Sequence, residues 1–198
     1  MVFAYADPPY VGKSGYYADH PDYDGEVDHV DLFRRLEIYD AWALSCSADS
    51  LPGLLRVAPE GVRVAVWVRG VRPSRSLRPL NAYEPVIYYG GRAVASRSRT
   101  DTLAHGYHPS FLADGLIGAK PAAFCYWMFD LLGAHAGDTF VDLFPGSGTV
   151  MRAWRLFSSP HEEAKRLSTY GETAEPFRIS SAVDVCGQLR ETDDCGEL

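Results

Sequence analysis

The amino-acid sequence predicts an α/β fold with a doubly wound, mainly parallel sheet. Short apolar runs of the kind that form buried strands alternate along the chain with segments whose apolar residues have helical spacing. One of these strands passes through a glycine-rich turn into a helix, which is typical of doubly wound folds. A chain of 198 residues suits one domain of this kind with a single sizeable core.

The N-terminal part of the chain begins with a strand. Residues 2–6 are short and apolar and end at a proline-rich turn, which indicates a buried strand. Residues 11–27 are rich in Gly, Tyr, Asp and His and predict a functional loop. Residues 28–39 have apolar residues at helical spacing, and Asp28 can cap that helix. The apolar run at 41–45 predicts a second strand.

The middle of the chain contains two more strands. Residues 48–57 predict a short helix, in which Pro52 is tolerated only near the first turn. Residues 62–68 and 85–89 are rich in β-branched and aromatic residues and predict the third and fourth strands. Residues 90–117 show little periodicity, so we expect mostly loop there.

The C-terminal part returns to a clear pattern. Residues 121–133 predict a helix with proline at its start and glycine at its end. Residues 140–144 predict the fifth strand, and 147–157 a helix after the glycine-rich turn. The pattern then weakens, although 177–185 is a candidate strand.

Composition limits the partners. No apolar run is long enough to cross a bilayer and the N-terminus does not resemble a signal peptide, so we expect a cytoplasmic protein without membrane contact. None of the four cysteines forms a CxxC pair and no histidine cluster has zinc spacing, so we expect no metal site. The net charge of −7 argues mildly against nucleic acid, but Arg63–Arg99 carries eight arginines and only one acidic residue, Glu84.

Asp7-Pro8-Pro9-Tyr10 follows the first strand. The two prolines fix the backbone φ angles and remove two N–H donors, so this turn is rigid, with a carboxylate before it and an aromatic ring after it. Such a turn can hold something flat that carries hydrogen-bond donors.

A second motif, Asp142-Leu143-Phe144-Pro145-Gly146-Ser147-Gly148-Thr149, lies between a strand and a helix. Its glycines allow a tight turn and close approach of a ligand, and the start of the helix offers free N–H groups to a carboxylate or phosphate. It is neither GxGxxG nor a P-loop, which argues against a nucleotide triphosphate. In a parallel sheet, both motifs lie at carboxyl ends of strands, where ligands bind.

Together the two motifs resemble those of amino-methyltransferases that use S-adenosylmethionine (SAM) to methylate exocyclic amines of nucleobases. The catalytic motif comes first and the cofactor loop late, and Ala119-Lys120-Pro121 is similar to a Lys-Pro element of the permuted β class of adenine-N6 and cytosine-N4 DNA methyltransferases. The resemblance covers roughly Phe3 to Trp154. It implies a circularly permuted, Rossmann-like methyltransferase fold.

The resemblance also implies an organisation of the chain. A single domain would span 1–158, with a catalytic half (1–95), a short recognition or loop segment (96–118) and a cofactor-binding half (119–158), followed by a C-terminal extension (159–198).

The resemblance implies roles for the motif residues. The Asp7 carboxylate and the Pro8 carbonyl, on the rigid turn that includes Pro9, would accept hydrogen bonds from the two N–H groups of the target amine. Tyr10 would stack on a base flipped out of the duplex. By the same resemblance, Asp7 would also border the methyl group of SAM. The implied cofactor-binding residues are Asp7, Lys120, Phe124, Asp142, Phe144, Gly146, Ser147, Gly148 and Thr149.

Basic and aromatic residues are candidates for nucleic-acid contact. They are Lys13, Tyr16, Arg69, Arg72, Arg75, Arg78, Arg97, Arg99 and His108. Tyr16, Tyr17, His20 and Tyr23 are candidates for a lid over the base, and His105, Tyr107 and His108 lie where the β class carries its recognition segment. The expected partner is DNA, most of all double-stranded DNA, and a homodimer is left open because dimers are common in the resembled class.

The sequence departs from the family pattern in two places. After Trp154 there is no clear strand ending in an acidic residue for the ribose, although Glu162, Glu163 and Asp184 are candidates, which leaves open a sheet truncated at the cofactor-side edge. The His-Pro that often precedes Lys-Pro is displaced to His108-Pro109.

Adenine N6 in DNA is the expected target, because the catalytic motif begins with Asp rather than Ser, and a restriction–modification or phage-type modification enzyme would fit. Cytosine-N4 methylation of DNA, adenine-N6 or guanine-N2 methylation of RNA, and a catalytically degenerate nucleic-acid-binding module are the alternatives.

Overall fold

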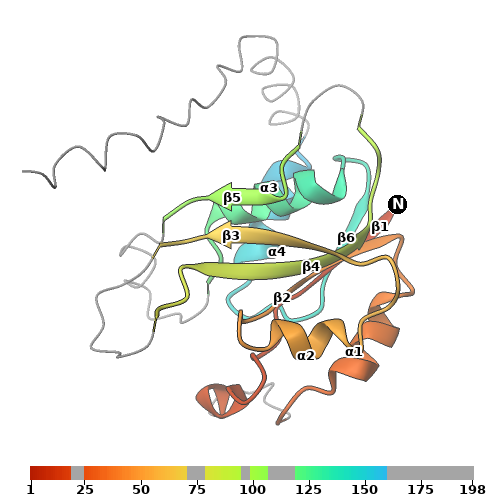
Figure 1. Ribbon diagram of the computed structural model, residues 1–198. Coiled ribbons are helices and arrows are strands. Elements are labelled where there is room, and N and C mark those ends of the chain that lie inside the picture. Colours follow the sequence, from red (N-terminus) through yellow and green to blue (C-terminus); the bar gives the residue numbers. More distant parts are fainter. Residues whose placement is uncertain (19–24, 71–78, 95–98, 107–118, 160–198) are drawn as a thin grey trace, which may run out of the picture. The chain divides into compact units, whose positions relative to one another are not determined.

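The computed structural model describes residues 1–18, 25–70, 79–94, 99–106 and 119–159. The chain divides into two units, residues 1–163 and 164–198, and all described residues belong to the first. Its centre is a six-stranded sheet in the order β5-β3-β4-β2-β1-β6 (Figure 1). The strands are β1 (Val2–Ala6), β2 (Ala41–Ser45), β3 (Arg63–Val68), β4 (Tyr83–Gly90), β5 (Thr102–Ala104) and β6 (Thr139–Asp142).

The sheet is mixed but mostly parallel. β1 pairs in parallel with both β2 and β6, and β3 pairs in parallel with β5. β4 is antiparallel to its two neighbours, β2 and β3. Five strands of this sheet therefore point the same way and β4 points the opposite way, which places the start of β4 at the edge where β1 and β2 end.

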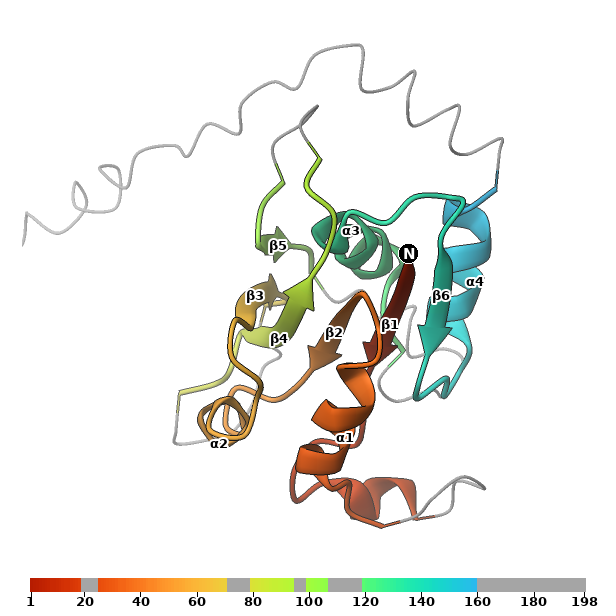
Figure 2. The same cartoon turned by 90° about the vertical axis from the view of Figure 1, so that its right-hand side faces the viewer.

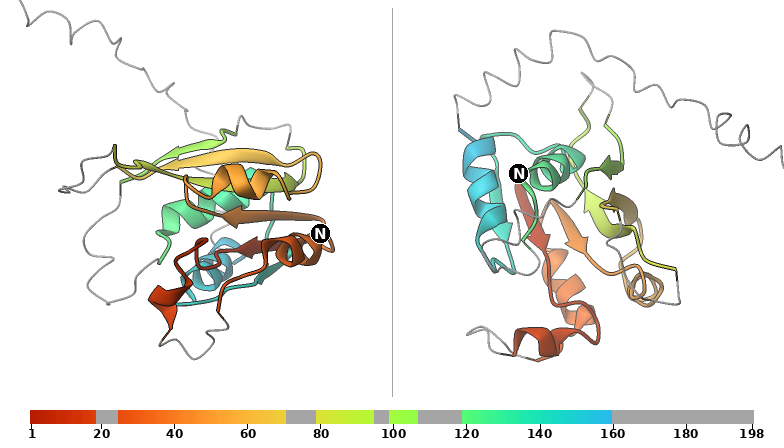
Figure 3. Two further views of the ribbon diagram at one scale, coloured as in Figure 1. Left: turned by 60° about the horizontal axis from the view of Figure 1, so that its bottom comes forward. Right: turned by 90° about the vertical axis from the view of Figure 1, so that its left-hand side faces the viewer.

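Helices cover both faces of the sheet. The helices are the 3-10 turn η1 (Ser14–Tyr17), α1 (His29–Leu36), α2 (Leu51–Leu55), α3 (Ala122–Leu132) and α4 (Thr149–Phe157). α1 and α2 lie on one face and α3 and α4 on the other (Figure 2), an arrangement that the further views also show (Figure 3). None of the helices in the described ranges combines the length and the apolar character needed to span a membrane.

The two faces of β1 explain why its sequence is apolar throughout. Phe3 and Tyr5 belong to the core under α3 and α4, whereas Ala4 and Ala6 belong to the core under α1 and α2. A strand that is buried on both faces needs no polar alternation. This arrangement confirms the predicted α/β fold with helices on both faces of a mostly parallel sheet.

The observed elements differ from the predicted ones mainly at their ends. Asp28 caps α1, as predicted, because its carboxylate accepts hydrogen bonds from the N–H groups of Val30 and Asp31. α2 is shorter than predicted: the predicted first turn is instead closed by Ser47 and Ser50, whose side chains are joined by a hydrogen bond.

Within 90–117, where we expected mostly loop, Thr102–Ala104 forms the short strand β5. This strand is formed by its pairing with β3, a segment much earlier in the chain. Three residues are also too few to show a periodicity in the sequence. The predicted strand at 177–185 lies outside the described residues.

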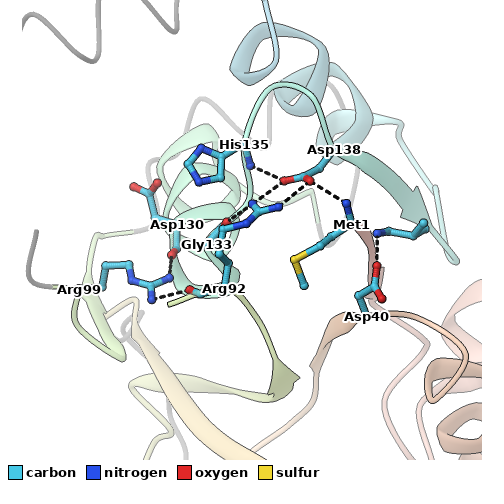
Figure 4. Close-up of polar contacts among 9 residues, drawn as sticks. Met1, Asp40, Arg92, Arg99, Asp130, Gly133, His135 and Asp138 are labelled. Atoms are coloured by element: carbon cyan, nitrogen blue, oxygen red, sulfur yellow. Dashed lines mark hydrogen bonds and ion pairs between the residues drawn. The ribbon is translucent and has the colours of Figure 1, made fainter. Parts of the chain in front are cut away.

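At the edge of the sheet where β1 starts, the carboxylate of Asp138 gathers several donors (Figure 4). The guanidinium of Arg92 donates to both of its oxygens, at 2.8 and 2.9 Å. The backbone N–H of His135 and the terminal amine of Met1 also donate to it. Arg92 additionally reaches the Gly133 carbonyl, so the end of α3 is tied to the residues after β4 and before β6.

Gly133 ends α3 as predicted, and its position requires glycine. Its φ of 68° is left-handed, and a Cβ there would lie 2.5 Å from the Arg92 carbonyl oxygen. Arg99 packs at the same place: it donates to the carbonyls of Asp130 and Arg92.

Candidate active site

The two sequence motifs meet at the carboxyl edge of neighbouring strands. β1 and β6 are paired in parallel with Tyr5 opposite Asp142, so Asp7 and the glycine-rich turn both leave the same edge of the sheet. The Leu143 N–H donates to the Tyr5 carbonyl at 2.9 Å and continues the pairing past the end of β6. Brought together by the sheet, these two loops form the edge at which α/β folds of this type bind ligands.

Asp7 is held by a lysine from a distant segment. The Lys120 ammonium donates to Asp7 Oδ2 at 2.6 Å. Lys120 lies just before α3, whose N-cap is Pro121, and its side chain is 5% exposed, whereas that of Asp7 is 21% exposed. Lys120 occupies one carboxylate oxygen, and among the described residues Asp7 has no other side-chain ion pair or hydrogen bond. The carboxylate is thereby oriented and keeps an oxygen for another donor.

Glu84, at the start of β4, is the second carboxylate at Lys120. Its Oε1 lies 3.3 Å from the Lys120 ammonium and its Oε2 lies 3.3 Å from Arg69 Nη1. The contact with Lys120 is an ion pair without hydrogen-bond geometry, since Oε1 has no hydrogen-bond partner in the described part of the chain. Sequence reasoning missed this residue, although one signal was present: Glu84 is the single acidic residue in an arginine-rich segment and directly precedes a predicted buried strand.

The charged groups at this position shift the pKa values of Lys120 and Asp7. Burial alone lowers the pKa of Lys120, but the carboxylates of Asp7 and Glu84 outweigh it and raise that pKa well above its usual value. Lys120 is therefore an ammonium at neutral pH. Burial raises the pKa of Asp7, the Lys120 ammonium opposes this, and Glu84 adds to it.

Two tyrosines border the same charged group. Burial raises the pKa of Tyr10 well above its usual value; the Lys120 ammonium opposes this, and Glu84 and Asp7 add to it, so Tyr10 is a neutral phenol. Tyr5 is fully buried, and its hydroxyl shares a 2.8 Å hydrogen bond with Ser45 Oγ at the end of β2. Tyr10 is thus the partly exposed aromatic residue of the site, whereas Tyr5 supports it from within the core.

Phe124 lies beneath Lys120 in the core. Its side chain is fully buried, and its ring packs against those of Tyr5 and Trp67, with centroids 6.1 and 5.1 Å away. The Lys120 ammonium is 5.8 Å from its ring centroid. Phe124 therefore supports Lys120 from a core position.

Asp142 has an unsatisfied oxygen at the start of the glycine-rich turn. Its Oδ1 accepts a hydrogen bond from the Phe144 N–H at 3.2 Å, but Oδ2 is buried and has no partner among the described residues. Burial raises the pKa of this carboxyl to about 6. A buried acceptor without a donor costs free energy, so this position suits a ligand that brings a donor or a positive charge.

The turn itself is open toward a ligand. Gly146 and Gly148 have φ angles of 45° and 70°, and a Cβ on Gly148 would meet nothing within 4 Å. Gly148 is the N-cap of α4, and the Ser147 and Thr149 hydroxyls share a 2.7 Å hydrogen bond beside it. These features fit the SAM site that the sequence resemblance implies, because open glycines and the start of a helix lie next to an unsatisfied carboxylate.

The structure places only some of the candidate nucleic-acid contacts. Arg69 is paired with Glu84, and Arg99 is engaged with carbonyls at the end of α3. Lys13 precedes η1, in which Tyr16 and Tyr17 lie, and the His105 carbonyl accepts a hydrogen bond from the Trp67 indole. The other candidates lie outside the described residues: Arg72, Arg75, Arg78, Arg97 and His108 for nucleic acid, His20 and Tyr23 for the lid, Tyr107 for recognition, and Glu162, Glu163 and Asp184 for the ribose.

No protein-family model matches this sequence, and no curated protein sequence matches it. Solved structures do match its fold. M1.HpyAVI in complex with SAM has a TM-score of 0.57 at 14% identity, over 85% of this chain and 87% of that chain. M1.HpyAVI in a second structure has a TM-score of 0.54 at 14% identity, over 79% and 76%.

TTHA0409 of Thermus thermophilus, assigned as a DNA modification methylase and solved with SAM, has a TM-score of 0.48 at 11% identity, over 85% and 86% of the two chains. At such identities the likeness to M1.HpyAVI establishes the fold of this chain and not its activity.

Proposed function

We propose that this protein transfers a methyl group from SAM to the exocyclic amine of a DNA base, with adenine N6 as the expected target. The observation that carries the proposal is the position of Asp7. Its carboxylate follows β1 beside the glycine-rich turn after β6, with one oxygen held by Lys120 and the side chain still partly exposed. This is where the sequence resemblance requires the acceptor of the amine protons.

Methylation of an aromatic amine requires two hydrogen-bond acceptors next to each other. The lone pair of an aromatic amine is conjugated into the ring, so the nitrogen is a weak nucleophile. The Asp7 carboxylate and the Pro8 carbonyl would accept hydrogen bonds from its two N–H groups and so turn the lone pair toward the reacting methyl group. SAM supplies this methyl group as an electrophile when bound. The new C–N bond would form as the S–CH3 bond breaks, and the amine proton would pass to Asp7 directly or through water.

The cofactor would bind at the second loop. Asp142 would receive a donor from the amino-acid end of SAM, which would satisfy the Oδ2 atom that has no partner among the described residues. The glycines of 146–148 would allow close approach, and the first N–H groups of α4 would face the ligand. Likeness to a fold that was solved with SAM supports this assignment.

The remaining assignments follow the resemblance. Tyr10 would stack on the flipped base, and the chain would have its catalytic half at 1–95 and its cofactor half at 119–158, in the permuted order. Asp rather than Ser at position 7 favours adenine over cytosine as the target.

Nucleoside mass spectrometry tests the proposal. The wild-type protein and Asp7→Asn would be incubated with SAM and unmethylated genomic DNA, with total RNA alongside, and digested to nucleosides. The expected result is N6-methyladenine in DNA that is absent with Asp7→Asn. Glu37→Gln, which removes an exposed carboxylate at the end of α1, is the matched control and should keep wild-type activity.

Other products would change the proposal in defined ways. N4-methylcytosine would keep the mechanism and change the base, whereas methylation confined to RNA would replace the substrate. SAM at a hundredfold excess over its dissociation constant should stabilise the protein by about 2.7 kcal/mol. If neither nucleic acid is methylated and SAM gives no such stabilisation, the enzyme is rejected in favour of a binding module.

A further inference from the structure

Two carboxylates share one buried ammonium at this site. Lys120 Nζ lies 2.6 Å from Asp7 Oδ2 and 3.3 Å from Glu84 Oε1. Lys120 and Glu84 are almost fully buried, with exposed side-chain fractions of 5% and 3%. Lys120 alone is enough to orient Asp7, because the hydrogen bond between them is formed and the two charges cancel. Glu84 is thus an additional negative charge next to the proposed catalytic pair.

The charge of Glu84 is only partly offset from outside. Arg69 lies on the other carboxylate oxygen of Glu84, at 3.3 Å, but its side chain is 35% exposed. Water screens a partly exposed guanidinium more strongly than it screens a buried carboxylate. Glu84 also raises the pKa of Asp7, which is the direction that a nearby negative charge imposes. The surroundings of Asp7 therefore carry an excess of negative charge.

We propose that Glu84 is a positioning residue that keeps the Asp7–Lys120 site net negative, so that the site prefers the cationic sulfonium of SAM to the neutral thioether of S-adenosylhomocysteine (SAH). The inference rests on the proposed function, because it assumes that SAM binds beside Asp7. It adds a reason for product release: methyl transfer removes the positive charge from the cofactor, and the same negative site then holds SAH less tightly.

The dissociation constants of SAM and SAH test this inference without any need for turnover. SAM and SAH differ by one methyl group and one charge at the sulfur. A change in the ratio of their dissociation constants between the wild type and a Glu84 variant therefore reports on how the protein senses that charge. Isothermal titration calorimetry of the full chain should show that Glu84→Gln lowers the preference for SAM over SAH by about fivefold, the scale of one partly buried charge at close range. Glu37→Gln, the same substitution at an exposed position, should leave the preference unchanged.

A charge-conserving variant separates charge from shape. Glu84→Asp keeps the carboxylate but shortens the side chain by one methylene group. We expect this variant to keep most of the wild-type preference for SAM, even if both ligands bind more weakly. Arg69→Gln serves when Glu84→Gln does not fold, as judged by circular dichroism: it removes the guanidinium that partly offsets Glu84, so the preference for SAM should rise.

The outcomes are distinguishable from one another. A folded Glu84→Gln that binds SAM and SAH in the wild-type ratio would show that Glu84 only supports the fold, and the inference would be rejected while the proposed function stands. A Glu84→Asp variant with a preference well below that of the wild type, or an Arg69→Gln variant whose preference does not rise, would reject it in the same way. A wild-type protein that binds neither ligand would instead refute the proposed function.

Discussion

The Lys120 ammonium and the Asp7 carboxylate form a 2.6 Å ion pair across 113 positions of sequence. The pair joins the end of β1 to the start of α3, so it links the proposed catalytic turn to the half of the chain that carries the glycine-rich loop. Because Lys120 is almost fully buried while Asp7 is partly exposed, the lysine orients a carboxylate that a ligand can still reach. The predictions below follow from this pair and its surroundings.

Asp7→Asn should abolish methyl transfer and retain the fold. The amide keeps the shape of the side chain but accepts a proton far less well, so we expect a loss of at least 100-fold in rate. Asp7 also accepts the hydrogen bond of the Lys120 ammonium, so we expect a stability loss of about 1.5–3 kcal/mol, an amount typical of a hydrogen bond to a charged group. Nucleoside mass spectrometry and urea unfolding measure the two effects. Transfer within threefold of the wild-type rate would contradict the role of Asp7.

Lys120→Met should destabilise the protein, and more so as the pH rises. Removing one member of a buried ion pair costs about 3–5 kcal/mol. Burial and Glu84 both raise the pKa of Asp7, and without the ammonium nothing at this position opposes them. Folding then favours protonated Asp7, so stability is lost as the pH rises above the unfolded value near 4. Thermal unfolding at pH 5 and pH 8 checks this prediction. A melting temperature that lies equally far below that of the wild type at both pH values would show that charge is not the cause.

Asp142→Asn should stabilise the ligand-free protein at neutral pH and weaken SAM binding. Burial raises the pKa of Asp142 to about 6. A raised carboxyl pKa means that its stabilising contribution is complete below the unfolded value near 4 and is lost as the pH rises through about 6. The amide does not ionise, so the variant does not lose this stability as the pH rises. Its melting temperature should therefore exceed that of the wild type at pH 7.5 but not at pH 4. We expect a gain of about 1 kcal/mol, because the carboxyl is partly solvated.

The same variant separates stability from binding. If Asp142 receives a donor from SAM, Asp142→Asn should bind SAM at least tenfold more weakly, although the ligand-free protein is more stable. Unchanged SAM affinity would show that the Oδ2 atom of Asp142 does not meet the cofactor. Glu37→Gln, measured in parallel, controls for the loss of a carboxylate elsewhere.

Asp138→Asn should destabilise the protein without changing its affinity for SAM. The Arg92 guanidinium holds the pKa of the Asp138 carboxyl well below its usual value, and Arg92 bonds both carboxylate oxygens. A lowered pKa gives stability that is present above about pH 4 and lost as the pH falls further. We expect a deficit of about 2 kcal/mol at pH 7 that shrinks in acid. Arg92→Lys, which keeps the charge but loses the paired hydrogen bonds, should reproduce part of the deficit.

Arg99→Gln should lower stability rather than nucleic-acid affinity. Its guanidinium donates to the Asp130 carbonyl in α3 at 2.8 Å and to the Arg92 carbonyl after β4 at 2.9 Å, so it is engaged in the fold. DNA binding, measured by fluorescence anisotropy at several salt concentrations, should show the same dependence on salt as the wild type, since each lost phosphate contact would change the slope by about one. A reduced slope without a lower melting temperature would restore Arg99 to the candidate nucleic-acid contacts.

The elements around the site could be predicted because their signals are local. An apolar run ending in Asp7-Pro8-Pro9 predicts β1, and the start and end of α3 follow from Pro121 and Gly133. The carboxyl edge shared by the two loops also follows, because alternating strands and helices predict parallel strands. The sequence by itself thus determined which residues end the strands at the candidate site.

Only the tertiary structure decided which charges face one another there. Glu84 reaches Lys120 because β4 runs antiparallel to β2, which brings the start of β4 to the edge where β1 ends. Nothing within a few residues of Glu84 specifies that pairing, and the same holds for β5 and for the carbonyls that engage Arg99. Periodicity, proline and glycine act over a few residues, whereas strand order and buried ion pairs depend on packing between segments far apart in the chain.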